Sequence, residues 1–381
     1  NQWSVIMNIQ ISQENLQKGI QTVQNVVSSK TALPILSNVL LEAVEGKLIF
    51  KATDLDISIS TSVPAIVFEE GSITLPAKKF AEIIKELPAI SVSLEVEQTQ
   101  DHYGWVTLKS ERGMFKIMGI RKDEFPNFPE VSPENQITLS AHMLKRMIQK
   151  TIYAVSSDDT RPALGGLLFE VLPDSVTTVA TDGRRLSQYS ATVSTSIANE
   201  LQVIVPPKAL HHLSHLLGSD DLMVEITFDE NYIVFQLDET TIFSRLIEGP
   251  FPDYKQVIPA DNDKLIVVNR HDFAASLRRV SILASQQTRQ IKLALSPNLV
   301  EISVNTPEIG EAKEEIPAEY TGEPMEIGYN ASFLLDVVRN MDSERIQLQF
   351  GEPDGAGIFV PLDTEEHETY MALCMPLRLL S

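Results

Sequence analysis

The sequence predicts an α+β protein of three similar domains, each with two helices packed on antiparallel sheets. Two observations lead to this prediction. Helix-like segments recur every 124 to 130 residues, and short alternating segments with the period of half-buried strands lie between them. Short strands joined by turns favour antiparallel sheets, with the helices gathered on one face.

Six helix-like segments carry the repeat. The first of each domain opens with Ser or Asn, whose side chain can accept hydrogen bonds from unpaired backbone amides, and apolar residues follow at helical spacing. These first segments start 128 and 129 residues apart, and the second segments start 130 and 124 residues apart. The first segments cover 12–29, 140–156 and 269–285, and the second cover 76–88, 206–218 and 330–342.

The strand-like segments and their turns repeat as well. KLIFKATD and SVTTVATD both end in Ala-Thr-Asp, at Ala52 and Ala180, and each is followed by another alternating run. The repeats end alike, with Phe-Pro at 125 and 251 and Met-Pro at 375. We therefore expect three domains, covering 7–131, 132–259 and 260–381.

Composition indicates a globular protein outside any membrane. Of the 381 residues 43% are hydrophobic and 22% charged, and no apolar run approaches the roughly 20 residues of a membrane span. The single cysteine, Cys374, excludes an internal disulfide framework and suits a reducing compartment. We expect a cytoplasmic location.

The charge is unevenly distributed. The net charge is −21, which argues against coating nucleic acid wholesale, yet the six helix-like segments hold twelve Lys and Arg and six Asp and Glu, a net of +6. One alternative is that these cations only lie on solvent-exposed helix faces and bind nothing. Their recurrence in all three repeats favours a mildly basic face that follows a polyanion through sequence-independent phosphate contacts. The candidate cations for such contacts with nucleic acid are Lys78, Lys79, Lys85, Lys145, Arg146, Lys150, Arg278 and Arg279.

Catalytic motifs give little support to an enzyme. His211 and His215 form an i, i+4 pair on one helix-like segment, which leaves a metal-dependent hydrolase open as an alternative, but no third ligand follows from the sequence. No phosphate-binding glycine loop or nucleophile elbow is present, and nothing near Cys374 marks an activating base. We expect a non-enzymatic protein without metal or other cofactor.

Several stretches together resemble one family. ATDGRRLS at 180–187, FPDY at 251–254, MPLRL at 375–379 and LPAKKFAEIIKELP at 75–88 occur in the order and spacing of the bacterial DNA polymerase III beta subunits, the sliding clamps. The resemblance runs from Met7 to Leu379. It implies a head-to-tail homodimer that forms a six-domain ring around duplex DNA, with helices lining the hole. The implied function is that of a processivity factor.

The resemblance also implies particular sites. An apolar pair at the dimer junction corresponds to Ile282 and Leu283, and Lys30 and Lys78 match positions that contact DNA. A surface pocket would receive short linear motifs from the DNA polymerase III alpha subunit, the clamp loader, other polymerases and repair proteins. Its members correspond to Arg161, Leu164, Thr181, Gly183, Arg184, Arg185, Leu186, Pro252, Val257, Leu373, Met375, Pro376, Leu377, Arg378 and Leu379.

The turn at 180–186 combines shared and added features. Its Ala-Thr-Asp portion also occurs in the first repeat, so we expect Asp182 to form the turn and not to act as a general base. Gly183, Arg184 and Arg185 differ from the first copy, and we expect them to form the edge of the pocket. A peptide-binding scaffold that never contacts DNA remains a further alternative.

Overall fold

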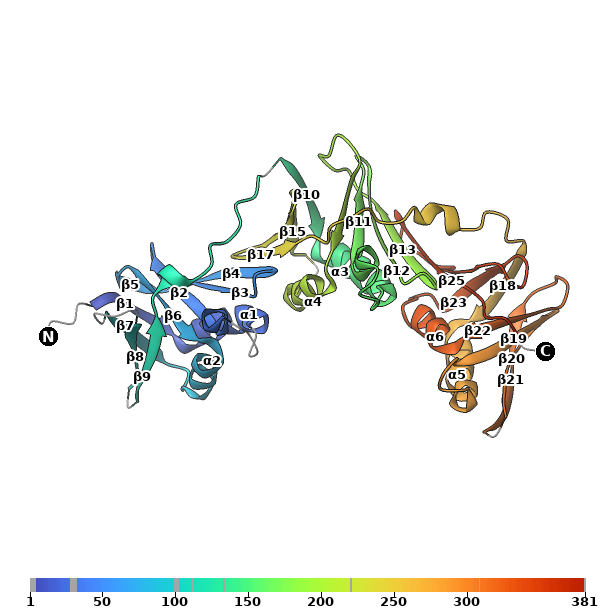
Figure 1. Cartoon of the computed structure of the whole chain (residues 1–381), viewed down its shortest axis with the longest axis horizontal. Helices are drawn as coiled ribbons and strands as arrows, with labels where there is room; N and C mark the ends of the chain where they lie inside the picture. Colours follow the sequence, from blue (N-terminus) through green and yellow to red (C-terminus); the bar gives the residue numbers. More distant parts are fainter. Residues whose placement is uncertain are drawn as a thin grey trace. The chain divides into compact units, whose positions relative to one another are not determined.

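The computed structural model describes residues 5–27, 33–98, 103–111, 113–132, 134–219, 221–307 and 309–379. They form two compact units (Figure 1). Unit 1 consists of Asn1–Ala141 and Lys208–Leu246, and unit 2 of His142–Pro207 and Ile247–Ser381. Residues of the predicted middle domain therefore contribute to both units.

Unit 1 contains a 13-stranded antiparallel sheet with the order β10-β15-β16-β17-β4-β3-β2-β6-β9-β8-β7-β1-β5. The alternating runs of the sequence form these strands: in β3, Leu48, Phe50 and Ala52 are buried while the residues between them are less so. The strands are β1 (Val5–Ser12), β2 (Asn38–Val44), β3 (Lys47–Thr53), β4 (Ile57–Pro64), β5 (Ile66–Glu69), β6 (Gly71–Pro76), β7 (Ser91–Gln98), β8 (Tyr103–Lys109), β9 (Met114–Ile120), β10 (Asn135–Ser140), β15 (Met223–Phe228), β16 (Tyr232–Leu237) and β17 (Thr240–Arg245).

The helices of unit 1 are α1 (Gln13–Val23), α2 (Ala77–Glu86) and α4 (Pro207–Leu216). The side chain of Ser12 accepts a hydrogen bond from the backbone N–H of Asn15, so the predicted cap starts α1. Leu16 and Ile20 of α1 and Phe80 of α2 are completely or almost completely buried, and they form the core beneath the helices. The 3₁₀ turns are η1 (Gln24–Val26), η2 (Pro34–Ser37) and η3 (Lys122–Glu124).

Unit 2 contains a 12-stranded antiparallel sheet with the order β14-β11-β12-β13-β25-β24-β23-β18-β21-β20-β19-β22. Its core includes the fully buried rings of Phe350 and Phe359, which pack edge to face with Tyr329 close by. The strands are β11 (Leu167–Val171), β12 (Ser175–Thr181), β13 (Arg185–Thr192), β14 (Leu201–Val205), β18 (Lys264–Asn269), β19 (Gln290–Ser296), β20 (Leu299–Thr306), β21 (Gly310–Glu319), β22 (Met325–Asn330), β23 (Arg345–Phe350), β24 (Gly357–Pro361) and β25 (Glu368–Cys374).

The helices of unit 2 are α3 (Ala141–Thr151), α5 (Arg270–Val280) and α6 (Ala331–Arg339). Asn269 and Asn330 cap α5 and α6, because each side chain accepts backbone N–H groups of the first turn. The 3₁₀ turns are η4 (Ile152–Ala154), η5 (Pro162–Gly165), η6 (Tyr254–Val257) and η7 (Ser281–Leu283). In the part of the chain that the structure describes, no helix is long and apolar enough to cross a membrane.

The repeat is visible in the helix ends. Each first helix continues directly into a 3₁₀ turn, η1 after α1, η4 after α3 and η7 after α5. The predicted helices 12–29, 140–156 and 269–285 are therefore longer than the α-helices themselves, because the chain tightens in the last turn and then becomes extended. In the third repeat, α5 ends at Val280, so Ile282 lies in the 3₁₀ turn η7 and outside the α-helix.

Candidate functional site

The turn between β12 and β13 is built by Asp182. Its carboxylate accepts hydrogen bonds from the backbone N–H groups of Arg184 (2.9 Å) and Arg185 (3.0 Å), and the Thr181 hydroxyl donates to the Arg185 carbonyl (2.7 Å). Gly183 has φ +85°, in the left-handed region that favours glycine. The carboxylate is occupied with backbone amides, which agrees with the turn-forming role expected for it.

The first repeat contains the same turn. Thr53 donates to the carbonyl of Ile57 (2.9 Å), and the Asp54 carboxylate accepts from the backbone N–H groups of Asp56 (3.1 Å) and Ile57 (2.7 Å). Leu55, with φ +81°, stands where the second copy has glycine. Because the two hydrogen-bond patterns match residue by residue, the shared Ala-Thr-Asp has a structural role in forming the turn. The two turns differ in the residue at the left-handed position, which is Leu55 in the first and Gly183 in the second.

An apolar cluster lies beside this turn in unit 2, and we refer to the surface over it as the trough. The buried residues of the cluster include Leu186, Leu373 and Tyr254, and Ala163 and Phe251 pack against them. β13 and β25 pair so that Leu186 lies opposite Leu373. Among the predicted pocket residues, Leu164, Leu186 and Leu373 are buried, Thr181, Arg185, Pro376 and Leu377 are half-buried, and Arg161, Gly183, Arg184, Pro252, Val257, Met375, Arg378 and Leu379 are exposed.

The C-terminal segment is anchored along the trough. The backbone N–H of Met375 donates to the carbonyl of Arg184 (2.8 Å), and that of Leu377 donates to the carbonyl of Gly328 (2.8 Å). The Gln290 side chain donates to the carbonyl of Arg378 (2.9 Å). Val257 and Met375 are 55% and 41% exposed, so apolar surface remains open beside a buried floor.

The three predicted arginines have different surroundings. Arg161 pairs with Asp158 (3.1 Å) and donates to the carbonyl of Asp182 (3.1 Å), while Arg184 is exposed. The Arg185 side chain is only 12% exposed and pairs with Asp182 (3.1 Å) and with Asp336 of α6 (2.6 Å). Arg185 thus differs from the expected rim donor, because its guanidinium is already paired beneath the surface.

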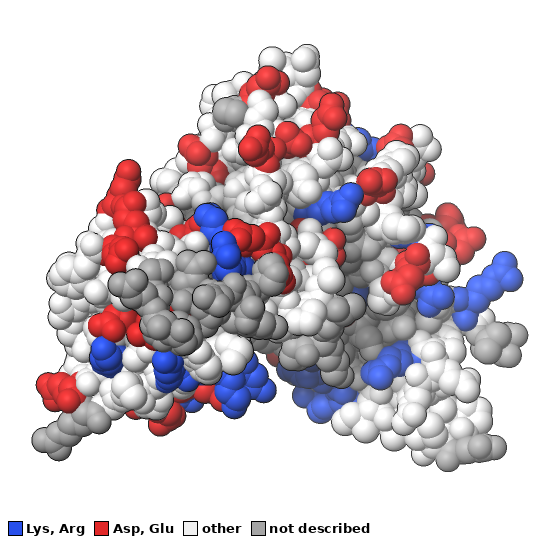
Figure 2. Space-filling model, turned by 60° about the vertical axis from the view of Figure 1, so that its left-hand side comes forward, with Lys and Arg blue, Asp and Glu red and all other residues white. Residues whose placement is uncertain are grey.

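Exposed lysines line the helices of unit 1. Lys78, Lys79 and Lys85 of α2 border a hollow of about 630 Å³ between α2 and α1, and Lys18 of α1 is exposed as well. In the view of Figure 2, several basic side chains lie along the lower edge of the face, and most of the acidic ones lie above it. Lys30 lies outside the described residues.

Two of the three predicted DNA-binding cations of α3 form ion pairs within unit 2. Arg146 pairs with the buried carboxylate of Glu368 (2.8 Å) and with Asp342 (3.2 Å). The Lys150 side chain, 8% exposed, pairs with Asp342 (2.7 Å), and burial lowers its pKa although that pair opposes the effect. These two residues depart from the charge-based expectation, since they act as structural ion pairs inside unit 2. Lys145 is half-exposed.

The cations at the end of α5 stay near the surface. Arg278 is exposed, and Arg279 binds Glu314 of β21 with both of its contacting nitrogens at 2.6 Å. Next to them, Ile282 is 76% exposed, the highest exposure among the large apolar side chains in the described part of the chain. Leu283 is half-buried. Ile282 is therefore not buried in the core of its own domain.

A second group of exposed apolar residues lies on β9 and was not predicted from the sequence. On β9, Met114 is 68%, Phe115 39% and Met118 49% exposed. β9 pairs with β8 along its length but with β6 only at Ile120, so most of its other edge is unpaired within the described chain. The signal was present in MFKIMGI, where apolar residues occupy both faces of a strand at a sheet edge.

The residues considered for catalysis do not form a reaction centre. His212 and His215 lie together in a hollow between α4 and α1, His211 is exposed, and the described residues contain no group of three His, Cys, Asp or Glu placed to hold a metal. Cys374 is completely buried in β25, and burial raises the pKa of its thiol to about 12. A thiol with that pKa stays protonated and unreactive at neutral pH.

Comparison with known proteins identifies the family. Models of the DNA polymerase III beta subunit match along the chain, the N-terminal domain at 7–129, the central domain at 138–253 and the C-terminal domain at 255–378. The beta sliding clamp of Pseudomonas aeruginosa is 34% identical over 378 residues, which cover 98% of this chain and 100% of the relative. That of Bacillus subtilis is 32% identical over 383 residues, with the same coverage.

Solved structures agree with these matches. The DNA polymerase III subunit beta of Pseudomonas aeruginosa has a TM-score of 0.92 at 33% identity, covering 98% of this chain and 100% of that one. A sliding clamp from the same organism, bound to griselimycin, has a TM-score of 0.91 at 33% identity and the same coverage. The matches do not support a hydrolase using His211 and His215, nor a scaffold unrelated to DNA. The chain belongs to the family of bacterial DNA polymerase III beta subunits, and its function is that of a non-catalytic DNA sliding clamp in replication.

Proposed function

We propose that two copies of this chain close head to tail into a ring of six domains around duplex DNA. The domains run over 7–131, 132–259 and 260–381. The single observation that carries the proposal is the family match along the whole chain, joined to the basic helices and acidic remainder of the sequence. A closed ring needs only weak DNA contacts, because topology retains it on the duplex.

The dimer would join two different surfaces, as a head-to-tail ring requires. The first is β9 with its exposed Met114, Phe115 and Met118, and the second is η7 and β21, with exposed Ile282 and half-buried Leu283. Both β9 and β21 have a largely unpaired edge within the described chain, since β21 meets β18 only near its end. Two such edges can pair and continue a sheet from one subunit to the next.

DNA would contact the helices through exposed cations. Lys78, Lys79 and Lys85 of α2, Lys145 of α3, and Arg278 and Arg279 of α5 remain candidates, together with Lys30 beyond the described residues. Arg146 and Lys150 are left out because their side chains are only 21% and 8% exposed and are paired with acidic residues of unit 2. Scattered cations of this kind suit sliding, since each phosphate contact is sequence-independent and screened by salt.

The trough of unit 2 would receive short linear motifs of the DNA polymerase III alpha subunit, the clamp loader, other polymerases and repair proteins. Its buried floor at Leu164, Leu186 and Leu373 and its open wall at Val257 and Met375 offer apolar side chains a place to bind. Methionine suits a surface with several partners because its flexible thioether repacks. A clamp of the family has been solved with griselimycin bound, so a relative accepts a ligand.

Retention on circular DNA tests the ring. After loading, the protein should stay on nicked circular DNA and leave when the circle is linearised, and sedimentation should give about twice the chain mass of 42.4 kDa. Met118→Asp, which places a charge at the proposed junction, should give monomers and lose retention, whereas Met223→Asp, at an equally exposed methionine on β15, should change neither. A wild-type protein that remains monomeric at micromolar concentration would overturn the proposal.

A further inference from the structure

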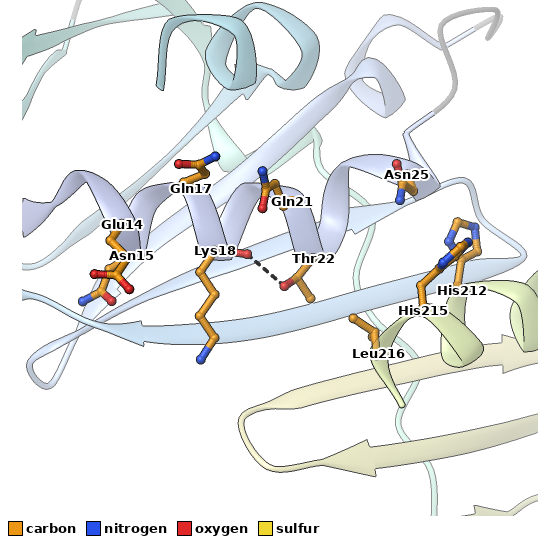
Figure 3. Close-up of a pocket in the computed structure, with 10 residues that line it drawn as sticks. All are labelled: Glu14, Asn15, Gln17, Lys18, Gln21, Thr22, Asn25, His212, His215 and Leu216. Carbon is orange, nitrogen blue, oxygen red and sulfur yellow. Dashed lines mark hydrogen bonds between the residues drawn. The ribbon is translucent and has the colours of Figure 1, made fainter. Parts of the chain in front are cut away.

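The hollow between α1 and α4 has an unusual lining. Its volume is about 580 Å³, and both helices that border it belong to unit 1. From α1 it receives Gln17 and Gln21, from η1 Asn25, each spaced four residues from the next, and from α4 the imidazoles of His212 and His215 (Figure 3). The lining is therefore rich in neutral hydrogen-bonding groups, two of which can gain a positive charge.

The charges around the imidazoles are few and nearly balanced. Across the hollow, α1 contributes one acid, Glu14, and one cation, Lys18. On the side of α4, Lys208 forms an ion pair with Asp54. His211, on the same helix, is exposed. Among the described residues around the hollow, Lys18 is consequently the one ammonium without an ion pair that a bound anion would meet, unless the imidazoles become charged.

His212 is held neutral when the hollow is empty of anions. Partial burial lowers its pKa, and the positive charge of Lys208 and the neighbouring His215 and His211 act in the same direction, against the opposing effect of Asp54. An anion beside the ring would reverse this balance, because it stabilises the imidazolium form. Proton uptake and anion binding at this place are therefore coupled.

We propose that this hollow binds a backbone phosphate of the encircled duplex, and that His212 and His215 take up protons as the phosphate enters. The inference rests on the proposed ring, which brings duplex DNA against α1 and α4. The amides of Gln21 and Asn25 donate to phosphate oxygens at any pH, and each imidazole gains a second N–H donor and a positive charge only when protonated. The grip of the clamp on DNA then tightens as the pH falls, and the sliding contact becomes looser as it rises.

Two imidazoles suit a phosphate better than a metal. A structural or catalytic metal in proteins needs three or four ligands, and the hollow adds no cysteine and only one carboxylate to the two rings. Phosphate needs donors without fixed geometry, which amides, a lysine and imidazolium groups supply.

The test compares the pH dependence of DNA binding. Affinity of the full-length protein for a fluorescent duplex is measured at about 50 mM salt between about pH 6 and about pH 8, for wild type and for His212→Gln/His215→Gln. Glutamine keeps a polar side chain of similar size without a titrating group. His367→Gln, at an exposed histidine of unit 2, is the control.

Wild type and the control should bind about tenfold more tightly at the acid end, as uptake of about one proton predicts, and the double variant should show little dependence on pH. In selectively labelled protein, the duplex should raise the pKa of the His212 imidazole, and inorganic phosphate at the same phosphate concentration should raise it much less. A double variant with the wild-type pH dependence would overturn the inference alone, as would an equal response to inorganic phosphate. Absence of duplex binding by wild type at every pH would overturn the proposed function as well.

Discussion

Replacing Arg185 with alanine probes the contact between the pocket turn and α6. The guanidinium binds Asp182 (3.1 Å) and Asp336 (2.6 Å), and it donates to the carbonyl of Tyr153 (2.9 Å). It also stacks over the ring of Phe333, 4.6 Å from its centroid. One side chain therefore links the turn, η4 and α6, which come from distant parts of the sequence.

The cost of the substitution follows from these contacts. Removing one partner of a buried ion pair typically costs about 3–5 kcal/mol, because the remaining charges lose their compensation. The side chain of Asp336 is 37% exposed and water can partly resolvate it, so we expect about 3 kcal/mol, the lower end of that range. For a unit of this size, that loss corresponds to a fall of about 6–12 °C in the unfolding midpoint.

Thermal unfolding of the full-length chain, followed by calorimetry, measures the effect. Arg184→Ala is the matched control, since Arg184 is the exposed neighbour in the same turn. Asp336→Asn should give part of the loss and should not add fully to Arg185→Ala, because both variants break the same contact. Motif-peptide affinity should fall in Arg185→Ala as the trough loses its fixed edge. A midpoint for Arg185→Ala within about 1 °C of both wild type and Arg184→Ala would refute the reasoning.

Two further predictions concern the turns and acid stability. Gly183→Ala should lower the free energy of unfolding by about 1–2 kcal/mol, since φ is +85° and the new Cβ would lie 2.8 Å from Arg161. Leu55→Gly should raise it by about 0.5 kcal/mol, because it relieves the same backbone strain. A rise for Gly183→Ala or a fall for Leu55→Gly in chemical denaturation would contradict this. Burial raises the pKa of the Glu42 carboxyl, but Lys51 and Lys122 outweigh burial and bring the pKa below 4.5, so its contribution is present above pH 4.5 and lost as the pH falls further. Glu42→Gln should therefore cost about 1–2 kcal/mol at neutral pH and progressively less as the pH falls below 4.5, and a cost that does not change with pH would count against the assignment.

Local features of the fold were predictable from the sequence. Helix starts at Ser12, Asn269 and Asn330 follow from a capping side chain and the apolar spacing behind it, and both signals lie within a few residues. Helix ends were less predictable. The α1 helix stops at Val23 although the apolar pattern continues, because a 3₁₀ turn buries Val26 equally well.

The roles of individual cations were not predictable. Arg146 and Lys150 look like surface charges on an amphipathic segment, yet Glu368 and Asp342, which neutralise them, lie about 190 to 220 residues further along the chain. The sequence shows which side chains are charged, but the structure is needed to show which acidic side chain lies beside each cation. The apolar residues of β9 illustrate the same limit, since a partly exposed edge strand has the composition of a buried one.

The difference between the two matching turns explains how one repeated unit acquires a site. Both turns have the same hydrogen bonds, so the backbone does not distinguish them. In the first copy, Leu55 occupies the left-handed position and leaves an apolar side chain half in solvent. In the second, Gly183 has no side chain, and the guanidinium of Arg161 occupies that space and binds the carbonyl of Asp182. Gly183 thus leaves room for the Arg161 guanidinium at the edge of the trough. The second repeat gains its proposed binding surface in this way while its backbone keeps the hydrogen bonds of the first.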